Sequence, residues 1–429
     1  MEPVKGATTA DRLAPRDPAR YDRRFAARAA GIKSSAMRDL MSLTERPEII
    51  TLAGGLPDTD SFPAEVFDEV WQAIARDHRA SALQYGPTEG LLELREMICG
   101  IMAEGGAEAQ PDGIIVTAGG QQAIDLSVRT FVDPGDVVLA EGPTYPGAVP
   151  SFSTYEARVV HVPLDDDGMR VDLLEERIEE LAAEDIRPKL IYTIPNFHNP
   201  GGVTMSLERR RRLVQIAHER EILIVEDNPY GQIRFEGEPL PTLWELDGGA
   251  GWVIHLSTFS KILAPGLRVG WAAAPAPVLR KMNLGKQAAD LGTGTLNQRF
   301  IVEYLRRFDW REHVTRLNGI YRSRRDAMLR ALEEEFPADA HWTRPQGGLF
   351  VWATLPSYID TTELLARAIE RHQVAFVPGR GAFLDGRGRN SLRMNYSYAN
   401  EATISEGVER IGAAIDEMVE LQKLLGGGS

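Results

Sequence analysis

The sequence predicts an α/β fold: a large domain with a mostly parallel seven-stranded sheet flanked by helices, plus a smaller α+β domain formed by the N-terminal segment and the C-terminal third. Three observations support this. From about residue 113, short apolar runs alternate with amphipathic helical stretches, as in parallel strands joined by crossover helices. Several runs are rich in β-branched residues with little alternation, as in strands covered on both faces. After residue 294 the pattern changes to a long helix and shorter mixed elements.

The length of 429 residues allows roughly two or three domains. We expect the chain to be divided, in order, into an N-terminal arm (1–30), a segment that packs with the small domain (31–60), the large domain (61–300), an interdomain helix (301–335), the small domain (336–425) and a tail or linker scar (426–429).

The charge balance excludes some classes of function. The net charge of −14, from 48 basic and 62 acidic residues, disfavours a nucleic-acid or anionic-membrane surface. No apolar run approaches the ~20 residues of a membrane span, and no signal-peptide pattern opens the chain. Residues 11–30 carry six arginines, but aspartates interrupt them, which favours a solvated arm over a transit peptide.

Cysteine usage points to a reducing, cytoplasmic setting. Cys99 is the single cysteine, so an intramolecular disulfide is excluded. The eight histidines are scattered and form no cluster at zinc-ligand spacing, so we expect no metal.

The first predicted elements precede the large domain. A capping Ser35 and apolar positions at helical spacing predict a short helix over 35–43 that ends before Pro47. The apolar run 49–52 then leads into Gly54 and Gly55. This glycine pair lets the backbone come close to another strand or to a ligand, and the sequence leaves both open.

The seven strands of the large sheet are predicted from apolar runs bounded by turn residues. These runs begin at Gly113, Asp136, Ala157, Lys189, Ile222, Trp252 and Leu267.

Five of the strands are followed by polar or aromatic groups that packing does not obviously require. A glycine-rich turn, Gly119 to Gln121, opens a helix where free N–H groups could receive a phosphate. Tyr145 could stack on a flat heterocycle or simply pack in its proline-rich loop. Asn199 precedes a proline and is biased to an extended conformation. Asp227 ends a strongly apolar strand and is either a functional acid or a helix cap.

The fifth group is Lys261, just past the apolar strand 252–256. An amine there is partly desolvated, so its pKa can fall and it can form a Schiff base with an aldehyde. The hydroxyls of Thr258 and Ser260 and the guanidinium of Arg268 suit a phosphate dianion. Together these groups match pyridoxal 5'-phosphate (PLP). A surface lysine in a turn is the alternative.

The carboxyl ends of parallel strands converge on one crevice, so these five groups are expected to face one pocket. Five coincidental caps are a poor explanation for a lysine, an acid, an amide, an aromatic ring and a phosphate cradle.

The C-terminal third is predicted to be α+β. Apolar positions at helical spacing predict one long helix over 297–336. Arg393 alternates with apolar neighbours and so points either to solvent or into the crevice. The remaining elements are expected to be strands near 349–352, 374–377 and 391–396 and helices near 362–372 and 401–424.

From about residue 30 to 424 the sequence resembles PLP-dependent aminotransferases of fold type I, the aspartate aminotransferase superfamily of classes I and II. It is most similar to the branch of 2-aminoadipate aminotransferases and kynurenine aminotransferase II. The shared strings are LAGGLP, LQYGPTEG, GGQQ, PTYPG, PNFHNPGG, EDNPYG, TFSKILAPGLRVG, GLFVW and SLRMNYS.

The resemblance implies a role for each matching residue. Lys261 would bind PLP covalently and move the substrate proton, and Asp227 would pair with the pyridine nitrogen. Tyr230 and Asn199 would hydrogen-bond the phenolic oxygen of PLP, and Tyr145 would stack on the PLP ring. The phosphate would be surrounded by Gly120, Gln121, Thr258, Ser260 and Arg268.

It also implies the substrate contacts and a partner. Arg393 would bind the substrate α-carboxylate, with Gly55 and Asn199 nearby. Tyr85 would reach the phosphate of a neighbouring subunit, which implies a homodimer with shared active sites. Arg38 matches an arginine that faces the side-chain carboxylate in 2-aminoadipate enzymes, or is a surface arginine.

Two positions depart from the family pattern. Gly120 stands where relatives often have serine, so one hydroxyl ligand of the phosphate is missing. Gly202 stands where many relatives have threonine or alanine, which alters a loop.

The implied function is ping-pong transfer of an amino group between an α-amino acid and a 2-oxo acid such as 2-oxoglutarate. The expected donors are 2-aminoadipate, glutamate or a large apolar or aromatic amino acid. One alternative is another PLP reaction on the same fold: that of a decarboxylase, a lyase or an oxidase. The other is a non-enzymatic regulator domain, although about 30 residues before the homologous region are too few for a DNA-binding domain.

Overall fold

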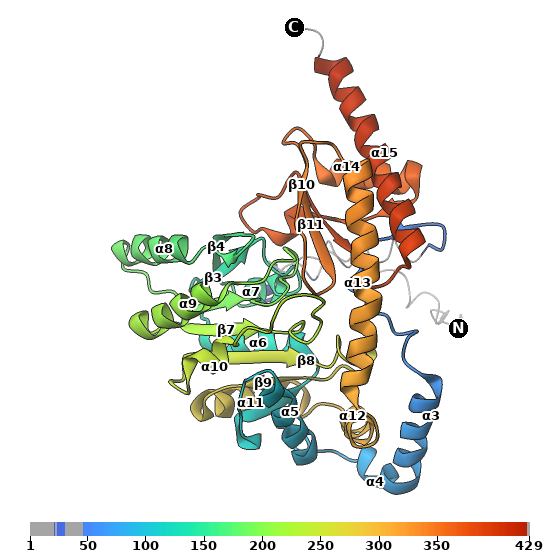
Figure 1. Ribbon diagram of the computed structural model, residues 1–429. Helices are drawn as coiled ribbons and strands as arrows, with labels where there is room; N and C mark the ends of the chain where they lie inside the picture. The colour runs from blue at the N-terminus through green and yellow to red at the C-terminus, as the bar shows by residue number, and fades with distance from the viewer. Residues whose placement is uncertain (1–20, 22–23, 31–45, 427–429) are drawn as a thin grey trace, which may run out of the picture.

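The computed structural model describes residues 21, 24–30 and 46–426 and has a large α/β domain and a smaller α+β domain (Figure 1). This confirms the predicted fold class. The helix predicted over 35–43 lies outside the described residues, and so does Arg38.

The large sheet has eight strands in the order β2-β9-β8-β7-β6-β3-β4-β5. All seven predicted strands are present, and the eighth, β5, is a two-residue strand too short to leave a periodic signal. Strand β9 runs antiparallel to both neighbours, and β5 runs antiparallel to β4. The strands are β2 (Ile114–Thr117), β3 (Val137–Gly142), β4 (Arg158–Asp165), β5 (Gly168–Met169), β6 (Leu190–Thr193), β7 (Leu223–Asp227), β8 (Val253–Thr258) and β9 (Gly270–Ala273).

Helices cover both faces of this sheet, which explains its continuously apolar strands. In β3, Val137 and Leu139 belong to one core, and Val138 and Ala140 belong to the other. The first core includes residues of α8 (Val171–Ala183), α9 (Leu207–Arg220) and α10 (Leu243–Asp247). The second includes residues of α5 (Leu92–Glu104), α6 (Gly120–Phe131), α7 (Val149–Thr154), α11 (Ala276–Asp290) and α12 (Thr295–Arg307).

The single helix predicted over 297–336 is wrong, because the chain forms α12 and then α13 (Trp310–Glu335). Phe308 is extended, and the side chain of Asp309 accepts a hydrogen bond from the N–H of Arg311. An aspartate that caps a new helix stops the preceding one. In Figure 1, helix α13 runs alongside both domains.

The small domain combines the C-terminal third with the segment around residue 50, as predicted. Its larger sheet has the order β10-β11-β14-β13, and β1 pairs in parallel with β12. The elements are β1 (Ile50–Thr51), β10 (His341–Trp342), β11 (Phe350–Thr354), α14 (Thr361–His372), β12 (Val374–Ala375), β13 (Val377–Pro378), β14 (Ser391–Asn395) and α15 (Glu401–Gly426).

The remaining helices are short. They comprise α1 (Ala27–Ala30), α3 (Ala64–Ala73), the π-helix η3 (Ile74–His78), α4 (Arg79–Ala82) and the 3₁₀ turns η4 (Pro111–Gly113), η5 (Pro265–Leu267) and η6 (Gly379–Ala382). Within the described part of the chain, no helix is both long and apolar enough to cross a membrane.

Candidate active site

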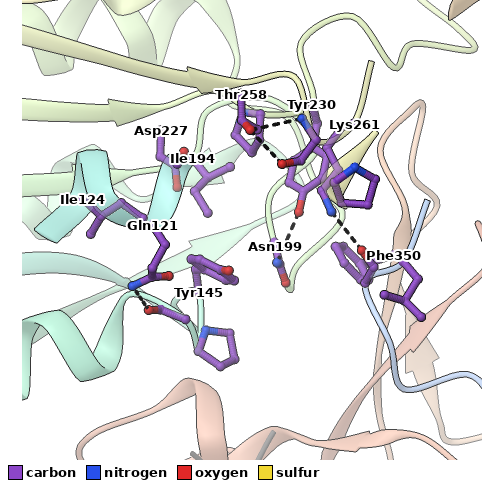
Figure 2. Close-up of a pocket in the computed structure, with 18 of the residues that line it drawn as sticks. Gln121, Ile124, Tyr145, Ile194, Asn199, Asp227, Tyr230, Thr258, Lys261 and Phe350 are labelled. Carbon is purple, nitrogen blue, oxygen red and sulfur yellow. Dashed lines mark hydrogen bonds between the residues drawn. The ribbon is translucent and has the colours of Figure 1, made fainter. Parts of the chain in front are cut away.

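The carboxyl ends of five strands of the large sheet meet at a cavity of about 360 Å³, which the small domain helps to close (Figure 2). Among the described residues that were predicted for the site, all but Tyr85 line this cavity. They are Gly55, Gly120, Gln121, Tyr145, Asn199, Asp227, Tyr230, Thr258, Ser260, Lys261, Arg268 and Arg393.

Lys261 lies in the turn three residues beyond the end of β8 and lines the cavity, where it is half-buried. Its Nζ donates a 2.8 Å hydrogen bond to the carbonyl oxygen of Gly55. The pKa of Lys261 is lowered to about 8, mainly by desolvation, and the positive charges of Arg393 and Arg268 contribute in the same direction. A lysine with this pKa has an accessible neutral amine, which is the form that attacks an aldehyde.

Asp227 is the last residue of β7 and is buried. Burial raises the pKa of its carboxyl to about 6, while a 2.7 Å hydrogen bond from the hydroxyl of Tyr192 and the nearby His255 oppose the rise. The carboxylate therefore predominates at neutral pH, so it can stabilise a cation placed in the cavity.

Arg393 points into the crevice, which settles the choice that the sequence left open. Its Nη1 donates to Oδ1 of Asn199 at 2.9 Å, and its Nη2 donates to the carbonyl oxygen of Ala53 at 2.7 Å. The guanidinium carbon lies 4.3 Å from the centre of the Phe350 ring. Burial lowers the pKa of Arg393 to about 10, so the group stays cationic and suits a carboxylate.

Asn199 also reaches the hydroxyl of Tyr230, to which its Nδ2 donates at 3.3 Å. These two side chains approach from the loops after β6 and β7. They place an amide and a phenol together on one wall of the cavity (Figure 2). The contact of Asn199 with Arg393 adds a guanidinium beside them.

The start of α6 presents groups that suit an anion to one corner of the cavity, which we call the anion-binding corner. No side chain caps this helix at Gly119, whose φ of 82° is left-handed. A Cβ at Gly119 would lie 2.5 Å from Nη2 of Arg268, so glycine lets the guanidinium approach the turn. The hydroxyls of Thr258 and Ser260 lie 2.8 Å apart on the same cavity. An uncapped helix terminus, two hydroxyls and a guanidinium are a suitable donor set for phosphate.

The aromatic rings of Tyr145 and Phe350 line the cavity, and each packs against a glycine. A Cβ at Gly147 would lie 2.3 Å from Cζ of Tyr145, so the ring lies directly against that glycine. A Cβ at Gly55 would lie 3.1 Å from Cζ of Phe350. Because residue 55 is a glycine, the ring of Phe350 can pack against it. The carbonyl oxygen of Gly55 also accepts the hydrogen bond from Lys261.

Sequence reasoning missed Tyr192 and Phe350. Tyr192 carries a hydroxyl in the middle of a buried strand, and a buried hydroxyl requires a partner, which was the available signal. Phe350 was within the matched string GLFVW, but its ring position depends on the pairing of β11 with β14, which places Phe350 opposite Asn395.

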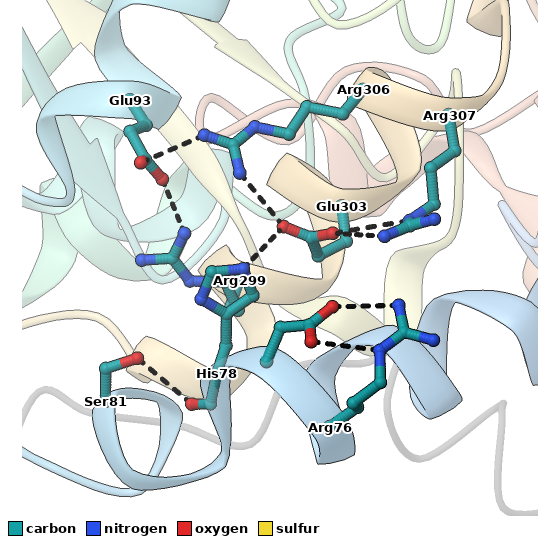
Figure 3. Close-up of polar contacts among 9 residues, drawn as sticks. Arg76, His78, Ser81, Glu93, Arg299, Glu303, Arg306 and Arg307 are labelled. Atoms are coloured by element: carbon teal, nitrogen blue, oxygen red, sulfur yellow. Dashed lines mark hydrogen bonds and ion pairs between the residues drawn. The ribbon is translucent and has the colours of Figure 1, made fainter.

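Tyr85 does not line the cavity of its own chain and is 86% exposed, just after α4. The helices that lead to it are fastened to α12 through the buried carboxylate of Glu303 (Figure 3). Glu303 lies 3.2 Å from Nε2 of His78 and is also paired with Arg306 and Arg307. The segment before Tyr85 is therefore held in place while Tyr85 projects outward.

Comparisons with known proteins identify the family of the chain. The family model described as "Aminotransferase class I and II" matches residues 47–411. An aromatic-amino-acid aminotransferase of Thermococcus litoralis is 44% identical, over 92% of this chain and 95% of the relative.

Two solved structures are also similar over nearly the whole chain. The kynurenine aminotransferase of Pyrococcus horikoshii in complex with PMP is 41% identical, with a TM-score of 0.89 and coverage of 93% of this chain and 98% of that one. The α-aminoadipate aminotransferase of Thermus thermophilus, complexed with N-(5'-phosphopyridoxyl)-L-leucine, is 38% identical, with a TM-score of 0.86 and coverage of 94% and 99%.

The chain belongs to the class I and II aminotransferase family. It is a PLP-dependent aminotransferase, and the residues of the cavity fit the cofactor. The neutral amine of Lys261 suits an aldehyde, buried Asp227 suits a protonated ring nitrogen, and the uncapped start of α6 with Arg268 suits a phosphate.

Proposed function

We propose that this aminotransferase accepts 2-aminoadipate, glutamate and large apolar or aromatic amino acids as donors, with 2-oxoglutarate as an acceptor. The observation that carries the proposal is the placement of Arg393 in the same cavity as Lys261, lined in part by the apolar side chains of Leu56, Ile194 and Phe350. A cationic group beside apolar walls suits an α-amino acid with a large side chain.

PLP supplies the aldehyde that takes up the amino group and the ring that accepts the electron pair released at the α-carbon. With PLP bound, Lys261 would hold the cofactor, and its Nζ would take the α-proton of the substrate and return it. Positioned acid–base catalysis of this kind is worth ~10²–10⁴ in rate. A pKa of about 8 lets Nζ act in both directions near neutral pH.

Arg393 orients the substrate by a charge-assisted contact with its α-carboxylate. Its guanidinium is fixed by Asn199 and by the carbonyl of Ala53, so little reorganisation is required on binding. Asp227 would favour a proton on the cofactor's ring nitrogen, because a buried carboxylate stabilises an adjacent cation. Tyr230 and Asn199 would supply hydrogen bonds to the cofactor's phenolic oxygen, and Tyr145 would stack on its ring.

We also propose a homodimer in which Tyr85 of each chain reaches the phosphate site of the other. The 86% exposure of a tyrosine on a segment anchored through Glu303 supports this, because aromatic side chains are common anchors at interfaces. Exposed Leu83 and Leu291 contribute further apolar surface. A cytoplasmic location stays a prediction from the cysteine content.

The proposal is tested with a panel of amino donors and oxo-acid acceptors run with added PLP. We expect turnover with 2-aminoadipate, glutamate and aromatic donors only when an oxo acid is present. Release of ammonia or CO₂ without an acceptor would instead indicate one of the alternative PLP reactions. Turnover restricted to small donors such as alanine would contradict the proposed substrate range.

A further inference from the structure

Lys286, on α11, is a buried cation that the catalytic roles above do not use. Its side chain is fully buried where α11 packs against α6. Its Nζ donates to Oε1 of Gln122 at 2.9 Å and to the two carboxylate oxygens of Asp290 at 2.9 and 2.7 Å. Burial of an ammonium is unfavourable unless it is paired and hydrogen-bonded. Gln122 and Asp290 meet this requirement, and the question is what the buried group does for the fold around it.

Gln122 connects Lys286 to the turn that opens α6. Its Oε1 also accepts a 2.8 Å hydrogen bond from the N–H of Ala118, and its Nε2 donates to Oδ2 of Asp290 at 2.7 Å. An ammonium can only donate and a carboxylate can only accept. Lys286 and Asp290 therefore determine which end of the amide faces Ala118. With the amide reversed, N–H groups would face each other at both Ala118 and Lys286.

The turn that Gln122 holds is the anion-binding corner of the cavity. Ala118 precedes Gly119, and its carbonyl oxygen accepts a 3.4 Å hydrogen bond from Nη2 of Arg268. Gly119 offers no side chain to cap α6, so Gln122 fastens the turn from the side facing α11. Gly120 lines the cavity on the other side.

We propose that Lys286 and Asp290 are positioning residues for the phosphate of PLP. They orient Gln122, and Gln122 keeps the turn from Ala118 to Gly120 in the shape that presents its N–H groups to the phosphate. The proposal rests on the proposed role of this turn as the phosphate cradle.

The experiment compares the dissociation constants of PLP and pyridoxal, which differ only in the phosphate. Lys286→Met keeps an unbranched side chain one atom shorter and removes the ammonium, and Lys281→Met on the exposed side of α11 is the matched control. We expect Lys286→Met to weaken PLP binding about tenfold or more, the loss of roughly one buried hydrogen-bond arrangement. Pyridoxal binding should be unchanged in both variants, which also establishes that they are folded.

A second variant keeps the test decisive if Lys286→Met does not fold. Gln122→Leu should show the same loss confined to PLP, and where both variants fold, adding Lys286→Met to it should cause no further loss. Equal losses for both ligands, no loss for PLP, or additive losses in the double variant would overturn the proposal.

The wild-type chain separates this proposal from the one on which it rests. If the chain binds PLP no more tightly than pyridoxal and Arg268→Gln changes neither, the assignment of the cradle itself is wrong. If Arg268→Gln weakens PLP alone and Lys286→Met does not, the cradle stands and only the positioning role fails.

Discussion

The hydroxyl of Tyr192 donates a 2.7 Å hydrogen bond to Oδ2 of Asp227, and both side chains are buried. Tyr192 comes from β6 and Asp227 from the adjacent, parallel β7. Because the hydrogen bond favours the carboxylate, it counteracts the burial that raises the pKa of Asp227 to about 6.

Tyr192→Phe should therefore raise the pKa of Asp227, since the variant loses a stabilising contact of the charged form. A hydrogen bond to a charged group is worth ~1.5–3 kcal/mol, which corresponds to about one pH unit or more. If activity requires the Asp227 carboxylate, the acid limb of the kcat/KM profile should move to higher pH. Tyr155→Phe, which removes a hydroxyl bonded to Asp125, is the control and should leave the limb in place. An unmoved limb in Tyr192→Phe would count against this assignment.

Lys261→Ala should abolish turnover, with a loss of at least ~10²–10⁴-fold from proton transfer alone. It should also remove the absorbance of covalently bound PLP while the fold survives. Lys281→Ala, on the exposed side of α11, should behave as wild type. A borohydride-reducible PLP adduct that persists at one specific site in Lys261→Ala would show that another lysine holds the cofactor.

Arg38→Ala tests the expected preference for dicarboxylic donors. If Arg38 contacts the side-chain carboxylate, KM for 2-aminoadipate should rise by ~10-fold or more while KM for leucine changes little. Arg344→Ala, at an exposed ion pair with Glu333, is a suitable control. An equal change for the two donors would remove Arg38 from the substrate site.

Subunit mixing tests the shared active site. A Lys261→Ala chain and a Tyr85→Ala chain are purified separately, each nearly inactive, and then mixed under conditions that exchange subunits. If Tyr85 acts across the interface, one site of the heterodimer carries both lesions and the other carries neither. Activity should then return.

If Tyr85 acted within its own chain, every site would keep one lesion and mixing would restore nothing. Mass spectrometry of the mixture establishes that heterodimers have formed. Two copies of the Lys261→Ala chain, mixed in the same way, give the baseline.

The strand pattern and the polar groups at strand ends could be predicted because both depend on short stretches of sequence. Lys261, Asp227 and Asn199 each follow an apolar run, and convergence of strand ends in a parallel sheet brings them together. Tyr192 could not be assigned from periodicity, because its partner depends on the pairing of β6 with β7.

The break between α12 and α13 and the burial of Lys286 could not be predicted from the spacing of apolar residues alone. The apolar spacing continues from α12 into α13, but the local cap at Asp309 overrides it. In the sequence, Lys286 cannot be distinguished from an ordinary lysine on a helix surface. Its burial follows only from the packing of α11 on α6. Side chains whose role is set by tertiary neighbours were thus the ones that sequence reasoning left unassigned.

The pairing of β1 with β12 has a consequence for how the chain is made. Ile50 and Thr51 lie opposite Val374 and Ala375, so the first strand has no sheet partner until more than three quarters of the polypeptide has been synthesised. The eight strands of the large sheet, from Ile114 to Ala273, are complete well before that. On the ribosome, the carbonyl of Gly55 can therefore meet Lys261 in its final setting only after the C-terminal third has emerged and fixed the N-terminal segment.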